Sequence, residues 1–372
     1  MVKMSNYKKG KELLNDLFVL ELANNHLGDL ERGMKIISQY SKVVRYNKIK
    51  AAIKLQIRDV DNFIHDDYKN YEKSRYISKT ISTKLSKDEY KALSDKIINS
   101  GCIAMATPFD EKSVDLCEEL EYPIIKIASS DANDWPLIEA VAAKKIPTIV
   151  STGGMTELDI DNIVDYFNSR NVPLAVNHCV SLYPSEDHEL ELDQIDYLKN
   201  RYPDNIIGFS SHEYHNWTNS MIASYAKGAR TWERHIDIDD NDVKVSKYNS
   251  LPDNVHEWFQ AYLKAREICG GNSTSRRIIS KKETVYLDEL VRGIYARKDI
   301  PEGTKISSNN FNDFFKLAIP LLKGQLSCRE IVNDTVILKD LSVNKPLMID
   351  DIDSPYSKSE NLKNIINNRG IN

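Results

Sequence analysis

Two histidines end two strand-like stretches of the sequence. The segment IIGFSSH closes on His212, and the following segment RTWERHID carries His235. In a barrel of parallel strands, the carboxyl ends of all strands meet at one mouth. Imidazole is a common ligand of divalent metals, so we expect the two histidines to share one ion. The alternatives are two hydrogen-bonded polar residues without metal, or a third ligand at His215 in the next loop.

Two lysines interrupt strands that are otherwise apolar. Lys54 lies in AAIKLQ and Lys126 lies in IIKIAS. A buried cation without an anion is costly, so we expect the two ammonium groups to flank a bound anion. For either lysine alone, a solvated or salt-bridged side chain is the alternative. The groups expected to complete a phosphate cradle are Thr107, Ser129, Ser151 and the loop amides near Gly153 and Gly154.

Other polar residues stand at or just past the ends of the same strands. They are Glu21, Asn24, Asn25, His26, Gln56, Asp131, Thr152, His178, Ser181, Tyr183, Ser210, Ser211 and Glu233. Cys179 beside His178 raises the alternative of a thiol nucleophile, against a buried free thiol.

The elements that carry these residues alternate in a regular way. From Leu17 onward, short apolar stretches are each followed by a helical pattern, in roughly eight units over about 250 residues. Strands buried on both faces that alternate with helices predict a parallel sheet. Eight such units predict an α/β fold of the (β/α)8 barrel type. An open doubly wound sheet is the competing fold, but no GxGxxG follows the first strand.

The chain is long enough for two domains. Its 372 residues exceed one average domain. We expect a barrel over residues 1–269, a Gly/Ser/Thr/Arg linker over 270–286, and a compact β-rich domain over 287–353. Residues 354–372 are expected to form a polar, loosely held tail.

Composition excludes several classes of partner. The formal net charge of -5 argues against general nucleic-acid binding. No apolar run approaches the ~20 residues of a membrane span, and the N-terminus lacks the apolar region of a secretory signal. The five cysteines are scattered and never form a CxxC pair, which favours free thiols in a reducing cytoplasm.

Several motifs, taken in order, resemble those of the sialic acid synthase family. They are ELANNHLGD, IKLQ, ATPFD, KIASSDANDWPLIEA, PTIVSTGGM, NHCVSLYP, GFSSH and WERHIDID. The C-terminal stretch RGIYARKDIPEGTKISSNNF is similar to the antifreeze-like (SAF) domain of that family. The resemblance implies a metal-dependent condensation of phosphoenolpyruvate with an aldose, N-acetylmannosamine by default or a related amino sugar or hexose. It also implies a homodimer in which the SAF domain covers the partner's barrel mouth.

The resemblance also implies roles for individual residues. The metal ligands would be His212 and His235, holding manganese, with magnesium or cobalt as alternatives. The catalytic set would be Glu21, Lys54, Lys126 and Asp131. The contacts to phosphoenolpyruvate would be Lys54, Thr107, Lys126, Ser129, Ser151, Ser181, Tyr183 and Ser211. The contacts to the acceptor sugar would be Asn25, Gln56, Asp131, Asp237 and Lys316.

The sequence departs from the family pattern mainly on the acceptor side. Asp131 stands where a glutamate is usual, Ser181 replaces an asparagine, and Ser211 replaces an aspartate. The segments Ser246-Lys247-Tyr248 and FFKLAIPLLKGQLS also differ from the family's acceptor-binding stretches. Two other functions therefore stay open: a catalytically silent sugar-binding homologue, and an aldolase that forms a Schiff base on Lys54 or Lys126.

Overall fold

The computed structural model describes residues 2–69, 71, 73–240, 243–270, 275–330 and 333–371. The chain forms two compact units, residues 1–271 and 272–372. Each unit has its own hydrophobic core, so each is described by itself.

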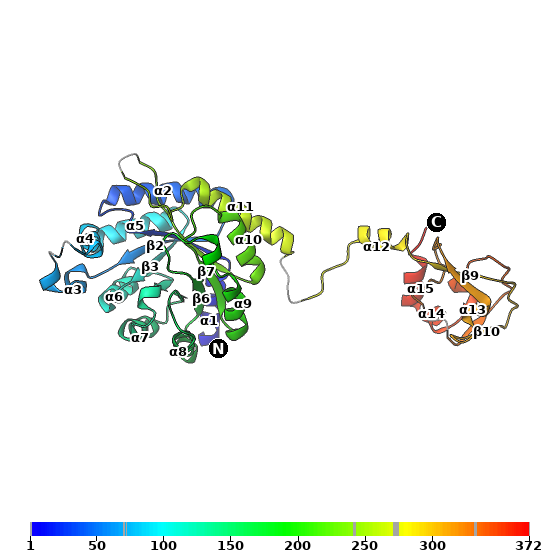
Figure 1. Ribbon diagram of the computed structural model, residues 1–372. Coiled ribbons are helices and arrows are strands. Elements are labelled where there is room, and N and C mark those ends of the chain that lie inside the picture. Colours follow the sequence, from blue (N-terminus) through cyan, green and yellow to red (C-terminus); the bar gives the residue numbers. More distant parts are fainter. Residues whose placement is uncertain are drawn as a thin grey trace. The chain divides into compact units, whose positions relative to one another are not determined.

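The first unit is a closed barrel of eight parallel strands in the order β1 to β8 (Figure 1). The strands are β1 (Leu17–Ala23), β2 (Ala51–Ile57), β3 (Ile103–Pro108), β4 (Ile125–Ile127), β5 (Thr148–Ser151), β6 (Leu174–Cys179), β7 (Ile206–Ser210) and β8 (Thr231–His235). Strand β1 pairs with both β2 and β8, which closes the sheet. The predicted (β/α)8 barrel is confirmed.

Helices alternate with these strands and surround them (Figure 1). They are α2 (Leu30–Asn47), α5 (Lys87–Asn99), α6 (Glu111–Glu119), α7 (Trp135–Lys144), α8 (Glu157–Ser169), α9 (Asp193–Arg201), α10 (Trp217–Lys227) and α11 (Pro252–Cys269). Several begin at side-chain caps that the sequence contains. Ser86 and Glu89 form a capping box at the start of α5, and Thr156 and Asp159 form one at α8.

Two apolar layers hold the barrel together. The larger one lies between the strands and the helices, and Phe18 stacks there on Trp232. The smaller one fills the bottom of the barrel with Leu17, Val19, Ala52 and residues of equivalent depth on the other strands. Helix α1 (Val2–Leu14), which the sequence analysis did not predict, adds Leu14 to this inner layer. The bottom of the barrel is therefore a packed core, and the chemistry must lie at the other end.

The region after β2 differs from expectation. A long polar loop was predicted up to Ser86, but the described part contains α3 (Val60–Phe63), a 3-10 turn at Asp66–Tyr68 and α4 (Arg75–Ser82). The side chain of Ser74 caps α4. Helix α4 brings Tyr76, Lys79 and Thr80 to the mouth of the barrel.

The second unit combines short strands with short helices, and all of its described strands lie within 287–353. It contains α12 (Lys281–Asp288), β9 (Gly293–Ala296), β10 (Lys305–Ile306), α13 (Phe311–Phe314), β11 (Phe315–Ala318), β12 (Thr335–Ile337), β13 (Ile352–Asp353), α14 (Pro355–Lys358) and α15 (Glu360–Asn367). Strands β10, β12 and β13 form one sheet, and β9 pairs with β11. The predicted linker 270–286 lies partly outside the described residues, and its C-terminal part is the start of α12.

The prediction of a loosely held tail over 354–372 is wrong. Helix α15 places Ile366 in the core of the second unit, where its side chain is 2% exposed. The backbone of Ile371 exchanges hydrogen bonds with Leu321 and Lys323. The apolar positions of this segment are few, but they are spaced on one helical face and so can be buried.

No helix in the described part of the chain is both long and apolar enough to span a membrane.

Candidate active site

All eight strands contribute a side chain to one pocket at their carboxyl ends. In strand order these are Glu21, Lys54, Thr107, Lys126, Ser151, Cys179, Ser210 and Glu233. The pairing of β1 aligns Glu21 with Lys54 on one side and with His235 on the other. The pocket has a volume of about 330 Å³, within the range of small-molecule sites.

A polar layer separates this pocket from the apolar bottom of the barrel. The Thr231 hydroxyl donates to the Asn177 Oδ1 at 2.5 Å. Both atoms lie against Gly208, where a Cβ would stand 1.9 Å from Thr231 Oγ1 and 2.2 Å from Asn177 Oδ1. Glycine is therefore required at 208 if these two strands are to carry this hydrogen bond beneath the site.

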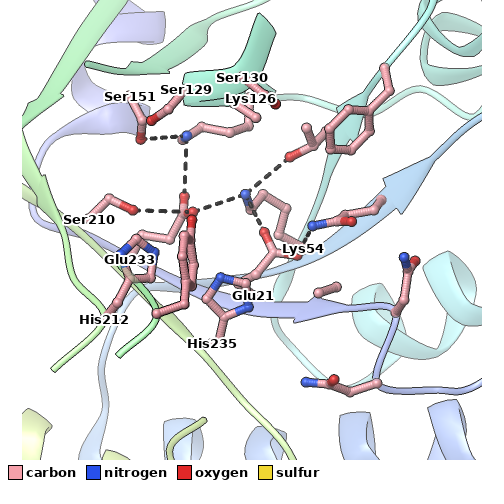
Figure 2. Close-up of a pocket in the computed structure, with 18 of the residues that line it drawn as sticks. Glu21, Lys54, Lys126, Ser129, Ser130, Ser151, Ser210, His212, Glu233 and His235 are labelled. Atoms are coloured by element: carbon pink, nitrogen blue, oxygen red, sulfur yellow. Dashed lines mark hydrogen bonds and ion pairs between the residues drawn. The ribbon is translucent and has the colours of Figure 1, made fainter. Parts of the chain in front are cut away.

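Glu233 lies between the two lysines that the sequence singled out (Figure 2). Its Oε1 is 3.0 Å from the Nζ of Lys54, and its Oε2 is 3.9 Å from the Nζ of Lys126. Glu21 makes a second, shorter ion pair with Lys54. The anion expected between the lysines is thus, in part, the protein's own carboxylate. This corrects the view that two buried cations require a ligand.

The two lysines differ in how well they are neutralised. Burial opposes the charge on Lys54, but Glu21 and Glu233 outweigh it and raise its pKa. Burial lowers the pKa of Lys126, which donates to Ser151 Oγ at 2.6 Å and to the Ile127 carbonyl at 3.2 Å. Lys126 has no carboxylate closer than 3.9 Å among the described residues. Of the two lysines, it is the one with more to gain from an added anion.

The carboxylates also divide into two kinds. Burial raises the pKa of Glu21 in spite of Lys54. Burial has the same tendency at Glu233, but Lys126 and Lys54 together hold its pKa well below the usual range. Glu233 is therefore a fixed anion, whereas Glu21 is the carboxyl that can exchange a proton. Two carboxyl groups whose environments separate their pKa values are typical of acid–base sites.

His212 and His235 face each other across the pocket, with ring centroids 5.6 Å apart. His212 Nδ1 is 3.0 Å from the Val180 carbonyl, an acceptor, so Nδ1 carries the proton and Nε2 is free. Burial lowers the pKa of His212 to about 4 and that of His235 well below its usual value. Neutral rings that keep a free nitrogen are the form that binds metals.

The donor set fits a divalent ion held by two protein ligands. A metal–nitrogen bond of about 2.1 Å on each ring is compatible with the observed separation of the centroids. Within the described ranges, no group of three or more His, Cys, Asp or Glu side chains is placed to hold an ion. Water or substrate would therefore complete the coordination, which suits manganese, magnesium or cobalt. His215 lies in the following loop beside Asp187 and does not line the pocket.

Tyr183 and Tyr248 complete the wall around the histidines. The Tyr183 ring is 4.0 Å from the His212 ring and 5.3 Å from that of Tyr248. The Tyr248 ring is 5.2 Å from that of His235. Tyr183 thus lines the pocket against a histidine, and its predicted contact to phosphoenolpyruvate stays a prediction.

Most of the predicted site residues come together in this pocket. They are Glu21, Asn25, Lys54, Gln56, Thr107, Lys126, Ser129, Ser151, Tyr183, His212 and His235. Ser129 also accepts the backbone N–H of Gly153 at 3.1 Å, which joins two loops of the predicted phosphate cradle.

Ser211 and Asp237 are not part of the pocket lining, and their contacts to substrate stay predictions. The Ser211 hydroxyl accepts from Arg234 Nη1 at 3.0 Å, on the face of β8 opposite Glu233. Its neighbour Ser210 lines the pocket instead. Asp237 is 3% exposed and binds Arg32 Nη2 at 2.7 Å.

Asp131 and Ser181, two other predicted residues, are not part of the pocket lining. Asp131 accepts from Ser130 Oγ at 2.8 Å, and burial raises its pKa. Ser181 lies behind the cradle, with its Oγ 2.1 Å from where a Cβ on Gly153 would stand. Lys316 belongs to the second unit and donates to Asn344 at 2.7 Å, so its contact to the acceptor stays a prediction.

Asp237→Asn tests the predicted contact at this position. Asp237 forms a buried ion pair with Arg32 and accepts a hydrogen bond from Asn249. We expect the substitution to cost about 3–5 kcal/mol of unfolding free energy, because it leaves Arg32 without this buried partner, and to leave the KM for the acceptor within about twofold. Thermal unfolding and steady-state kinetics measure the two effects. A large rise in the acceptor KM without loss of stability would restore Asp237 to the site.

The sequence alone assigns no role to Glu233 or Arg58. The structure places Glu233 at the centre of the pocket and Arg58 at its rim. Glu233 was noted at a strand end, and its separation of two from His235 was the signal that both face inward. Arg58 lies 3.5 Å from the Phe109 ring and donates to Gln56 Oε1 at 3.2 Å. Nothing in the local sequence distinguishes Arg58 from a solvated arginine.

The fold and the site together define a class of protein: a (β/α)8 barrel whose pocket is lined by two lysines, two carboxylates and two histidines. Comparison with known proteins gives the family. The model of the NeuB family matches residues 47–273, and the chain belongs to this family. The resemblance to sialic acid synthases is thereby confirmed, and with it the class of enzyme.

Individual relatives agree with this assignment. An N-acetylneuraminate-9-phosphate synthase of Drosophila melanogaster is 31% identical over 241 residues, which are 61% of this chain and 62% of the fly protein. A pseudaminic acid synthase of Campylobacter jejuni is 27% identical and covers 83% of this chain and 89% of its own. A solved structure from Chromobacterium violaceum, named for spore coat polysaccharide biosynthesis protein E, has a TM-score of 0.86 and 30% identity. It covers 91% of this chain and 99% of its own.

Proposed function

We propose that the protein condenses phosphoenolpyruvate with the aldehyde form of an amino sugar or hexose. The products are a 2-keto-3-deoxy sugar acid and phosphate. The observation that carries the proposal is that two lysines and two neutral histidines face one pocket, with Glu21 and Glu233 between them. Membership of the NeuB family, whose relatives include named synthases of sialic-type acids, supports the same reaction.

The lysines bind the donor in this proposal. Lys126 and Lys54 hold the phosphate and carboxylate of phosphoenolpyruvate, with Ser129, Ser151 and Thr107 as hydrogen-bond donors. Of these two lysines, Lys126 is the less neutralised, so the negative charge of the donor stabilises its ammonium group most. Fixed in this way, C3 of the donor faces the acceptor aldehyde, and such positioning supplies several kcal/mol of the barrier lowering.

The acceptor side uses the histidines. When bound at His212 and His235, a divalent ion supplies Lewis-acid polarisation of the aldehyde oxygen. The new bond joins C3 of the donor to the aldehyde carbon, and C2 becomes electron-poor. Water adds to C2, and one of its protons ends on the former aldehyde oxygen, which becomes a hydroxyl. The C2–O bond to phosphate then breaks, the second proton leaves with the phosphate, and the keto oxygen comes from water.

Glu21 is the residue we assign to the proton transfers. Burial raises its pKa and it contacts Lys54, so it can take a proton from the attacking water. General acid–base catalysis of this kind contributes about 10²–10⁴-fold. Glu233, held ionised by two lysines, is the weaker candidate for this role.

For the second unit we propose the SAF-domain role that the resemblance implies, covering the barrel mouth of a partner in a homodimer. Lys316, on β11, would be its contact to the acceptor.

The test of the reaction is a panel of aldoses offered with phosphoenolpyruvate and Mn²⁺. The panel includes N-acetylmannosamine, its 6-phosphate, mannose and diamino sugars. We expect phosphate release with at least one sugar, together with a product whose mass equals sugar plus pyruvate. Absence of any such product across the panel would overturn the proposal. Sugar binding without turnover would favour the silent homologue instead, an option raised by the absence of Asp131 and Asp237 from the described pocket lining.

One observation favours a Schiff-base aldolase as the second candidate. Burial lowers the pKa of Lys126, as a nucleophilic lysine requires. In that case activity would survive EDTA, and borohydride would trap a substrate on the chain at Lys126. We expect neither result, because Ser151 and Glu233 both stabilise the ammonium form of Lys126.

A further inference from the structure

The backbone pairing of β7 and β8 ends before it reaches both histidines. The ladder runs from Gly208–Thr231 to Ser210–Glu233. One more hydrogen bond, from Ser211 N to the Glu233 carbonyl at 3.0 Å, extends it. In this described stretch His212 lies one residue past that bond. The strand ladder alone therefore does not fix the distance between His212 and His235.

Arg234 bridges this gap from the outer face of the barrel. It precedes His235, and its side chain binds both neighbours of His212. Its Nη1 donates to Ser211 Oγ at 3.0 Å and lies 2.7 Å from Glu213 Oε1. Its Nη2 donates to the carbonyl of Glu213 at 2.6 Å. One guanidinium thus contacts residues 211 and 213 on either side of one histidine.

Ser250 joins the other histidine to the same group. Arg234 Nε donates to Ser250 Oγ at 2.9 Å, and the backbone N–H of Ser250 donates to the carbonyl of His235 at 2.8 Å. Trp217 Nε1 also donates to Ser250 Oγ, at 3.2 Å. The guanidinium of Arg234 therefore binds the residues on either side of His212, and it also binds Ser250, which holds the backbone of His235.

Arg234 and Glu213 form an ion pair that is almost completely buried. Arg234 is 1% exposed and Glu213 is 0% exposed. A buried ion pair of this kind is a poor device for stability, because desolvation offsets most of the attraction and an apolar pair of equal volume would often serve as well. The rigid fork of a guanidinium is, however, well suited to fixing distances between several acceptors.

We infer that Arg234 and Glu213 are positioning residues that set the spacing of His212 and His235 for one divalent ion. The inference rests on the proposed metal site. It assigns to the pair a role in metal affinity that is separable from its contribution to folding. Partners behind metal ligands typically change affinity about 10–100-fold when altered.

The test compares two variants that treat charge and geometry differently. Arg234→Lys keeps the charge and loses the fork. Glu213→Leu with Arg234→Met removes both charges and keeps apolar volume, so folding is expected to be retained. Free Mn²⁺ is titrated against the full-length protein and followed by electron paramagnetic resonance, with thermal unfolding in EDTA as the measure of the fold. We expect both variants to bind Mn²⁺ about 10–100-fold more weakly than wild type.

The matched control is Arg369→Lys. Arg369 and Glu330 form an ion pair in the second unit, with side chains 9% and 7% exposed, and the substitution should leave Mn²⁺ affinity unchanged. Folded Arg234→Lys and double variants that bind Mn²⁺ as tightly as wild type would overturn the positioning role and leave the proposed reaction intact. A wild-type protein that binds no Mn²⁺ while its unfolding is normal would instead overturn the metal site, and the inference with it.

Discussion

Replacing His212 or His235 by alanine is expected to abolish Mn²⁺ binding and to lower kcat/KM by about a thousandfold or more. In the proposed site, each ring supplies one of the two protein donors found among the described residues, so a single loss leaves the ion with one of them. The lost polarisation of the aldehyde is worth several kcal/mol, and each 1.36 kcal/mol is about a factor of ten in rate. Equilibrium dialysis with Mn²⁺ and steady-state kinetics on the active sugar measure the two effects.

His215→Ala is the control for this pair. His215 is in the same loop as His212, but its side chain is 44% exposed and turned toward Asp187. It should keep wild-type Mn²⁺ affinity and activity. The account of the site would be wrong if the His212 and His235 variants retained the ion, or if the His215 variant alone lost it.

Lys126→Met is expected to lower kcat/KM for phosphoenolpyruvate by about a hundredfold, mainly through KM. The ammonium of Lys126 lies 3.9 Å from its nearest carboxylate, whereas Lys54 contacts both Glu21 and Glu233. A hydrogen bond to a charged group contributes about 1.5–3 kcal/mol, which corresponds to this loss. The fold should survive, because Glu233 keeps Lys54 at 3.0 Å. Calorimetric titration with phosphoenolpyruvate measures the affinity directly.

Lys144→Met gives the matching control. Lys144 makes two ion pairs on the surface, with Asp115 and Glu118, and such pairs contribute little. It should leave both affinity and stability near wild type. If Lys126→Met bound phosphoenolpyruvate as well as Lys144→Met does, the anion pocket would have to be placed elsewhere.

The barrel and the main site residues could be predicted because they leave strong signals. Eight short apolar stretches alternate with capped helices, and the bottom of the barrel needs only apolar side chains. A lysine within such a stretch, as at Lys54 and Lys126, is conspicuous because it must be neutralised. The histidines were found because they follow the last apolar residues of two neighbouring strands.

Ser211 and Asp237 lie outside the pocket lining for a common reason, the place where a strand stops. If His212 faces inward, alternation in an extended strand directs Ser211 outward, and it does reach Arg234 on the other face. The same rule would place Asp237 inward with His235, but β8 ends at His235 and the chain turns toward Arg32. The end of a strand depends on tertiary contacts that the local sequence does not contain.

The carboxylates that neutralise the two lysines also could not be predicted from the local sequence. Glu21 and Glu233 are far from Lys126 in the sequence, and only closure of the barrel brings β1, β4 and β8 to one mouth. Helix α15 was missed for a related reason. It gains stability from packing Ile366 into the second core, and its own composition is polar.

The most direct test of the central claim is a crystal structure of the protein soaked with Mn²⁺ and phosphoenolpyruvate. We predict one Mn²⁺ ion bound by His212 and His235, with the carboxylate and phosphate of phosphoenolpyruvate contacting Lys54 and Lys126 in the same pocket. Phosphoenolpyruvate bound away from the two lysines, or Mn²⁺ bound by neither histidine, would contradict the account.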